Sequence, residues 1–198
     1  MNQIIKLTVG CLLALGMTVG ASGNRTPPDV LKAHADIAGV PGSGISGVIT
    51  FTQAPEDKNL PVPTVDVEAR VEGLTPGQHG MHIHEIGMCT NTIRPDGSIF
   101  IFGGAGGHFD PGPFGNSGVD INHPFHMGDL PNLVANEAGV GHLRATVSRI
   151  TLSDGPLSVF DANGSAIIVH LNPDQGITGV TGASGGARIA CGVIVRDN

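Results

Sequence analysis

The stretch from Gly77 to Thr90 carries the residues whose types and spacing most directly suggest chemistry. Its centre is His82-Ile83-His84, in a run of β-branched and apolar residues that favours a strand. Because successive side chains of a strand alternate between its two faces, His82 and His84 should project to the same side, about 6.6 Å apart. Two neighbouring imidazoles suggest a metal site, although two ordinary polar residues on a solvent-facing strand would give the same pattern.

More candidate metal ligands follow in a segment without regular periodicity, between Gly87 and Leu133. In a compact domain a gap longer than about 40 residues normally marks a functional loop. Imidazole and carboxylate side chains recur in this one, at His108, His123, His126 and Asp129. These residue types are ligands of zinc and copper, so the loop is expected to take part in a metal centre.

The segments that must position these histidines have the alternation of β-strands. In the clearest case four apolar residues alternate with four charged ones over residues 65–72. Alternating patterns or short apolar runs predict further strands at residues 31–39, 45–52, 143–152, 166–171 and 188–195. Within 143–152 the alternation slips near Ser148-Arg149, which indicates a bulge or a corner.

Composition favours the same class of fold. The chain has 31 Gly and 14 Pro with no Trp or Tyr, which is typical of short strands joined by turns and long loops. With about eight strands, no helical pattern and no repeat, the sequence predicts an all-β fold, an eight-stranded Greek-key sandwich or barrel. Two long functional loops, residues 87–133 and 172–187, would interrupt it.

The N-terminus has the three-part pattern of a secretory signal peptide. Lys6 precedes an apolar stretch over residues 7–19, and small residues around Ala21 offer a cleavage site. A stretch of about 13 apolar residues is too short to span a membrane. We therefore expect a signal peptide at residues 1–21, a disordered leader at 22–30 and one domain at 31–198, with export to a periplasm or to the extracellular space.

Cleavage there would leave two cysteines, Cys89 and Cys191, and two cysteines in an exported protein predict one disulfide. The bond would close a loop of about 100 residues, worth roughly 4 to 5 kcal/mol in the chain-entropy model. The net charge of −7 and the lack of a Lys/Arg cluster argue against a nucleic-acid partner. Nothing in the sequence supports a membrane-surface role, and a homodimer is compatible with it.

Five motifs, in this order along the chain, resemble the signatures of the copper/zinc superoxide dismutases. The resemblance extends from about residue 31 to residue 195. It implies the family's β-sandwich fold, a copper and a zinc cofactor, and superoxide as the substrate. The motifs are Gly80-Met-His-Ile-His-Glu85, Ala105-Gly-Gly-His-Phe-Asp-Pro111, His126-Met-Gly-Asp-Leu130, Val169-His170 and Ala187-Arg-Ile-Ala-Cys-Gly-Val-Ile194.

The resemblance also implies roles for single residues. Arg188 matches the arginine that meets the anionic substrate, although an ion pair with a loop carboxylate is its structural alternative. Asp174 matches a carboxylate that links the two metal sites through their histidines, His79 matches a structural histidine, and the two cysteines match the family's disulfide. The copper ligands would be His82, His84, His108 and His170, with His108 also bridging to zinc.

The zinc site departs from the family pattern. His126 and Asp129 match zinc ligands, but the family's further histidine, expected between His108 and His126, is missing from residues 112–121. His123 could replace it, Asp120 could, or the site could be incomplete. We favour His123, with a solvated side chain as its alternative.

The chemistry of dismutation asks for these residue types independently of the family. Moving one electron from one superoxide to another needs a metal with two accessible oxidation states, which copper has and zinc lacks. Imidazoles suit copper, and Arg188 supplies a fixed positive charge for a small anion. A copper-binding or copper-delivering module on the same fold would keep the ligands without needing Arg188, and a structural domain would need neither.

A second departure concerns the charge of the later loop. Residues 171–187 contain no Lys or Arg, where many members of the family have lysines that steer the substrate. Steering raises association rates by roughly 10- to 1000-fold, and superoxide dismutases are themselves a standard example of it. The sequence alone therefore predicts a slower and less salt-sensitive enzyme.

Overall fold

The computed structural model describes residues 29–55, 63–111, 126–176 and 182–198. These residues form β-strands and a single 3-10 turn, η1, and none of their helices has the length and apolar composition needed to span a bilayer. The signal peptide expected at 1–21 lies outside them. The elements are β1 (Leu31–Gly39), β2 (Ser46–Gln53), β3 (Val65–Glu72), β4 (Gly77–His79), β5 (Met81–His84), β6 (Thr92–Ile93), β7 (Ile99–Phe100), η1 (Gly103–Ala105), β8 (Leu133–Ala135), β9 (Gly141–Val147), β10 (Ala166–His170), β11 (Arg188–Val193) and β12 (Val195–Arg196).

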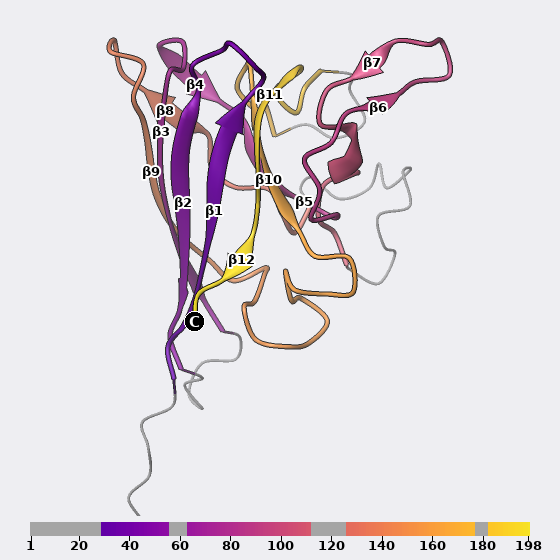
Figure 1. Cartoon of the computed structure of the whole chain (residues 1–198). Coiled ribbons are helices and arrows are strands. Elements are labelled where there is room, and N and C mark those ends of the chain that lie inside the picture. The colour runs from indigo at the N-terminus through magenta and orange to yellow at the C-terminus, as the bar shows by residue number, and fades with distance from the viewer. Residues whose placement is uncertain (1–28, 56–62, 112–125, 177–181) are drawn as a thin grey trace, which may run out of the picture.

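Ten of the strands form one antiparallel sheet in the order β4-β8-β9-β3-β2-β1-β11-β10-β5, with β12 paired to β1. Neighbours such as β3 and β9, or β1 and β11, are distant in the chain, as in a Greek-key arrangement. The two ends of the order, β4 and β5, are consecutive strands separated only by Gly80. The sheet therefore curls on itself into a nearly closed barrel (Figure 1).

The barrel interior holds the apolar face of each strand. In β3 the burial alternates without exception, so that Val65, Val67 and Val71 are fully buried while the charged residues between them face solvent. Phe51 of β2 and Ile83 of β5 join the same core. Fully burying each such side chain stabilises the fold by about 1.5 to 3 kcal/mol.

The predicted fold class is confirmed, but the strand count differs from the expected eight. The additional strands are two or three residues long, which is too short for a period-2 pattern to show in the sequence. The strand predicted at 188–195 divides into β11 and β12 at Ile194, which is buried and whose N–H donates to Ser165 O at 3.0 Å. The slip near Ser148 marks the end of β9, after which Ile150 is again buried.

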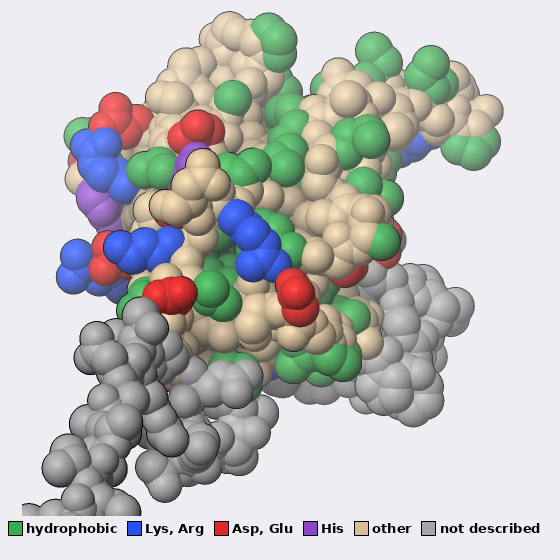
Figure 2. Space-filling model, turned by 60° about the horizontal axis from the view of Figure 1, so that its bottom comes forward, with side chains coloured by type: hydrophobic (Ala, Val, Ile, Leu, Met, Phe, Trp, Pro, Cys, Tyr) green, Lys and Arg blue, Asp and Glu red, His purple; other side chains and the backbone are tan. Residues whose placement is uncertain are grey.

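Part of the first long loop forms secondary structure of its own. After β5 the chain forms the β6–β7 hairpin, which projects from the barrel at the upper right of Figures 1 and 2 and bears hydrophobic side chains on its surface. Ile93 is 77% exposed and Ile99 62%. The chain then returns through η1 to the barrel wall at β5 and β10.

The returning loop explains why two strands are buried on both faces. Every residue of β5 and of β10 is buried. One face of each strand joins the barrel core, and the opposite face lies under the loop, where Phe102 and Ala105 pack against Ala166, Ile168 and Cys191. A strand covered on both sides has a continuous apolar run, which is the pattern seen at 166–171.

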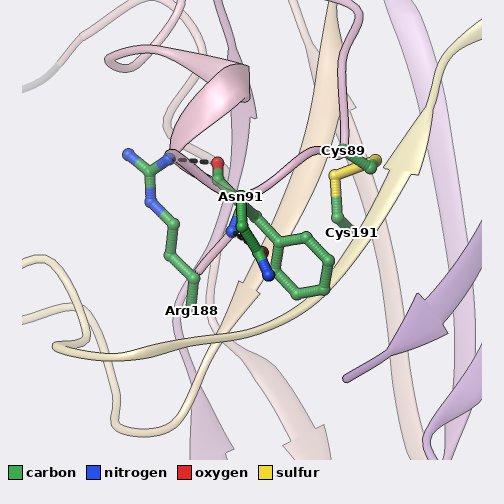
Figure 3. The surroundings of a disulfide bond; sticks show 5 residues. Cys89, Asn91, Arg188 and Cys191 are labelled. Carbon is green, nitrogen blue, oxygen red and sulfur yellow. Dashed lines mark hydrogen bonds between the residues drawn. A yellow bond between two sulfur atoms is a disulfide. The ribbon is translucent and has the colours of Figure 1, made fainter. Parts of the chain in front are cut away.

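The predicted disulfide is present between Cys89 and Cys191, whose Cα atoms lie 5.7 Å apart. It joins the start of the loop to β11 across a sequence separation of 102 residues. The loop that covers β5 and β10 is therefore covalently attached to the strand that begins with Arg188 (Figure 3).

Candidate metal centre and substrate cavity

Strand alternation places the two histidines of β5 together, as predicted. Met81 and Ile83 point into the barrel core, so His82 and His84 point to the opposite face, under the loop. Both imidazoles are fully buried. β10 pairs with β5, with Ile168 opposite His82, and ends in His170 at a register shift. Alternation along β10 puts His170 on the same face as Ile168, so His170 lies beside the β5 histidines.

Four histidines meet at this point. Their potential ligand atoms all lie within 4.8 Å of one another. The His108 ring stacks on His82 with centroids 4.1 Å apart and lies 5.0 Å from His84, while His170 is 4.8 Å from His82. The group consists of His82, His84, His108 and His170, the set expected for copper.

The hydrogen bonds of these rings test whether a metal fits. One nitrogen of each buried ring is held by the protein: His84 Nδ1 donates to Gly106 O at 3.1 Å, His170 Nδ1 to Gly186 O at 3.0 Å, and His82 Nε2 lies 2.6 Å from Asp174 Oδ2. Among the residues that the structure describes, the other nitrogen of each of the three finds no hydrogen-bond partner although it is buried. Such unpaired lone pairs are costly unless a metal takes them, and hydrogen bonding of the opposite nitrogen is how proteins orient metal-bound histidines. The site therefore fits a metal.

Burial also keeps three of these imidazoles, those of His84, His108 and His170, in the form that binds metals. It lowers the pKa of His170 to about 3 and the pKa of His84 well below its ordinary value, with neighbouring histidines and Arg188 contributing in the same direction. For His108 burial again lowers the pKa, although the Asp129 carboxylate opposes the shift. The rings are thus neutral near pH 7, which leaves their lone pairs available.

His108 also belongs to a second group, with His126 and Asp129. Its Nδ1 donates to Asp129 Oδ1 at 2.6 Å, and the His126 ring centroid lies 4.8 Å from that of His108. Burial alone would raise the pKa of Asp129, but the hydrogen bonds from the two histidines outweigh it and hold the carboxyl ionised. The hydrogen bond between His126 and Asp129 also raises the pKa of His126. Two imidazoles and a carboxylate are suitable zinc ligands.

A closed zinc site needs four ligands, and this group supplies three. Both replacements considered for the fourth, His123 and Asp120, lie outside the described residues. The identity of the fourth zinc ligand therefore stays a prediction.

Asp174 connects the two groups. Besides contacting His82, it shares a potential metal-binding cluster with His82 and Asp129. Asn132 fixes its backbone at both ends: Asn132 Nδ2 donates to Asp174 O at 2.9 Å, and Asp174 N donates to Asn132 Oδ1 at 2.8 Å. The sequence had singled out Asp174 but not Asn132, whose contacts bridge two loops 42 residues apart.

His79 stands apart from both groups. Its ring nitrogens lie 2.8 Å from the carbonyl oxygens of His170 and Thr75. With both nitrogens engaged it has none to offer a metal, in keeping with the structural role that the resemblance implies.

A cavity of about 520 Å³ opens beside the four histidines, with His108, His170 and Arg188 in its lining. The Arg188 guanidinium is half-buried and donates to two backbone carbonyls, Phe102 O at 2.8 Å and Gly106 O at 2.7 Å. Burial, with a smaller contribution from Arg94, lowers its pKa to about 10, so it stays charged near pH 7. The structure thus places a fixed cation at the opening toward the histidines.

Arg94 is a second cation at this cavity, and sequence reasoning missed it. The two guanidinium groups flank the Phe100 ring, with that of Arg94 4.1 Å and that of Arg188 4.5 Å from its centroid. Arg94 belongs to the β6–β7 hairpin, in the aperiodic segment that also holds the candidate ligands. No sequence pattern connects Arg94 to Arg188, which lies 94 positions later in the chain.

Comparisons with known proteins agree with this geometry. The family model described as copper/zinc superoxide dismutase matches residues 45–194. The chain is 36% identical over 194 residues to the Cu-Zn superoxide dismutase of Deinococcus radiodurans, across 97% of this chain and 98% of the relative. It is 37% identical over 123 residues to that of Photobacterium leiognathi, across 61% of this chain and 66% of the relative.

A solved structure gives the same result. The crystal structure of a SOD-like protein from Bacillus subtilis superposes with a TM-score of 0.59 at 30% identity, covering 82% of this chain and 97% of that one. Fold, histidine groups and sequence similarity over most of the chain converge on one assignment: the chain belongs to the copper/zinc superoxide dismutase family.

Proposed function

We propose that superoxide is dismutated in the cavity beside Arg188, and that copper is held there by His82, His84, His108 and His170. The observation that carries this assignment is the set of three buried imidazole nitrogens, for which the described part of the chain provides no hydrogen-bond partner, beside a fixed guanidinium. Superoxide dismutase activity and the two metals follow from the family. The residue roles are our proposal.

The reaction converts two superoxide anions and two protons into one O₂ and one H₂O₂. Copper, when bound, supplies the one-electron transfers because it has two accessible oxidation states. The protein's own task is then to admit a small anion, orient it and supply protons.

Arg188 performs the first two of these tasks in the proposed mechanism. Its guanidinium borders the cavity and is fixed by two carbonyls, so the anion meets a preorganised positive charge. His108 supplies the third, because it lies in both histidine groups and lines the cavity. Because Asp129 engages its Nδ1, its Nε2 is the atom that would take up a proton from solvent and pass it to the product.

Assays of the purified protein, with and without added copper, test the proposal. We expect dismutation only in the copper-loaded form. A protein that binds copper at these histidines but does not accelerate dismutation would instead be a copper-binding or copper-delivering module on the same fold.

For zinc we propose His108, His126 and Asp129 as three ligands and His123 as the fourth. The donor set and the ionised Asp129 support the first three. His123 is the one further histidine between His108 and His126 in the sequence.

Replacing His123 by Ala should sharply lower zinc content from one ion per chain, because a zinc site with one ligand removed loses affinity. Metal analysis of the purified variants measures this, with His126→Ala as the positive control and His142→Ala, an exposed histidine on β9, as the matched negative control. Equal zinc in His123→Ala and wild type, or none in either, would show that His123 is not a ligand.

Replacing Arg188 by Ala should lower kcat/KM by roughly 10-fold or more, because the cavity loses its innermost fixed cation. Copper content should not change, and inhibition by inorganic phosphate should weaken. Arg144→Ala removes an exposed arginine of β9 that pairs with Glu68 at 3.3 Å, and serves as the control for net charge. An unchanged rate would assign Arg188 a structural role only.

Arg94→Gln should lower kcat/KM at low ionic strength and flatten its dependence on salt, because Arg94 supplies a cation at the cavity that the loop 171–187 lacks. Rates measured from low to high salt test this, again with Arg144→Ala as the control. Wild type and Arg94→Gln with parallel salt curves would exclude a steering role for Arg94.

We also propose that the protein is exported, to a periplasm or to the extracellular space. The signal-peptide pattern at residues 1–21 supports this, and so does the Cys89–Cys191 disulfide, because such bonds persist in oxidising compartments. Mass measurement of the protein recovered outside the cytoplasm should find cleavage after Ala21.

A further inference from the structure

We propose that Asn91 is a positioning residue for Arg188, acting through the backbone of Phe102. The inference rests on the proposed role of Arg188 in meeting superoxide. Asn91 lies between the disulfide and Arg188 in Figure 3. Its own side chain does not line the cavity, so any effect on catalysis must pass through another residue.

The orientation of the Arg188 guanidinium depends on the short turn η1. Its two donor contacts go to Phe102 O and Gly106 O, and these residues are the caps at the two ends of η1. The guanidinium is thus held by both ends of one turn. Movement of either carbonyl would release one of its two hydrogen bonds.

The Phe102 end of this arrangement has an unfavourable backbone conformation. Phe102 has φ 50° and ψ 28°, the left-handed region, and is the one non-glycine residue with positive φ in the described part of the chain. A bulky side chain rarely adopts this conformation, because Cβ then approaches the following carbonyl. Such strain persists only where the surroundings hold it, and it is concentrated at functional sites.

Three contacts hold Phe102 in place, and one of them is the η1 hydrogen bond that its carbonyl accepts from Ala105 N at 3.2 Å. Its ring is buried in the cluster that includes Ile168 and Cys191. Its N–H donates to Asn91 Oδ1 at 2.9 Å. The ring contact fixes the side chain, whereas the Asn91 contact fixes the peptide plane that precedes the strained φ angle. The Asn91 bond and the η1 bond act on opposite sides of the Phe102 Cα atom, so the direction of the carbonyl depends on both.

The segment that contains Asn91 is itself anchored to the fold. Asn91 lies two residues after Cys89, which is bonded to β11, and its neighbour Thr90 accepts a hydrogen bond from Gly104 N at 2.9 Å. Gly103 and Gly104 allow η1 to pack against this segment, because an added Cβ would lie 2.0 Å from Thr92 Oγ1 and 2.3 Å from Thr90 Oγ1 respectively. Segment 89–92 is thus a rigid support for the turn.

Without the Asn91 acceptor, the left-handed conformation of Phe102 loses the anchor of its N–H and keeps only the η1 hydrogen bond of its carbonyl. The carbonyl would then no longer be fixed toward Arg188, and the guanidinium would rely on its bond to Gly106. The cation would remain but would no longer be fixed in one orientation, which weakens the contact with a small anion more than it weakens the fold.

The test measures Asn91→Ala, Arg188→Ala and the double variant in the copper-loaded protein. We expect Asn91→Ala to lower kcat/KM about 3- to 10-fold, the net effect of one hydrogen bond, and to weaken inhibition by inorganic phosphate by a similar factor. Copper content and the disulfide should be unchanged. Ser98→Ala is the matched control, because it removes an exposed hydrogen bond to Asp96 in the same loop.

The double variant separates positioning from a general structural effect. If Asn91 acts through Arg188, its replacement should cost nothing further once Arg188 is alanine. An equal loss in both backgrounds, or wild-type activity in Asn91→Ala, would overturn the proposal while leaving the role of Arg188 intact. Full activity in Arg188→Ala would instead refute the proposed function of that residue. Asn91→Leu, which keeps the size but not the acceptor, answers the same question if Asn91→Ala does not fold.

Discussion

Replacing His84 or His170 by Ala is expected to abolish copper-dependent superoxide dismutation, with a loss of at least about 100-fold, because loss of a ligand should exceed the 10- to 100-fold effect of altering a ligand's partner. Each of these rings is fully or almost fully buried, and each has one nitrogen held by a backbone carbonyl and one without a partner in residues 29–55, 63–111, 126–176 and 182–198. Removal of either ring leaves the copper group with three imidazoles and an open side.

The fold should survive both replacements. His84 and His170 project away from the barrel core, and the disulfide and the core cluster remain. Circular dichroism and thermal melting establish folding, metal analysis measures copper, and a stopped-flow or coupled assay measures dismutation. His142→Ala on the exposed face of β9 is the matched control. Full activity in either variant would contradict the proposed ligand set.

The parts of this site that the sequence could predict lie on regular strands. The alternation rule alone places His82 and His84 side by side, and the apolar run at 166–171 identifies β10 with His170 at its end. The family motifs then connect these strands to His108, His126 and Asp129, which the fold brings together. Strand alternation and family motifs both depend on residues close together in the chain, so they can be recognised in a single sequence.

The parts that could not be predicted depend on contacts between loops. Arg94 lines the cavity only because Phe100 of the hairpin packs against Arg188, the first residue of β11, and Asn132 holds Asp174 across 42 residues. The left-handed Phe102 has no signal at all, because a phenylalanine there contradicts local propensity. Where local preference and structure disagree, the surroundings must hold the residue, and such positions are concentrated near function.

The second large effect is expected from the disulfide. Replacing both cysteines by Ser should lower the free energy of unfolding by up to about 4 to 5 kcal/mol, because the bond closes a loop of 102 residues and restricts the unfolded chain. For a domain of this size the melting temperature should fall on the order of 10 °C. Cys191 is 2% exposed and packs with Phe102, so some packing is lost as well.

Activity should fall along with stability in the double cysteine variant. The bond anchors the segment that ends in Asn91, and through Phe102 that segment fixes the guanidinium of Arg188. Thermal melting of wild type with and without a reductant, beside the Cys89→Ser/Cys191→Ser double variant, measures the stability effect, because the variant should not respond to the reductant. Free thiols at both positions in the protein isolated from its source, found by mass spectrometry, would contradict the prediction. A variant that melts with the wild type would show that the core of the barrel alone holds the loop in place.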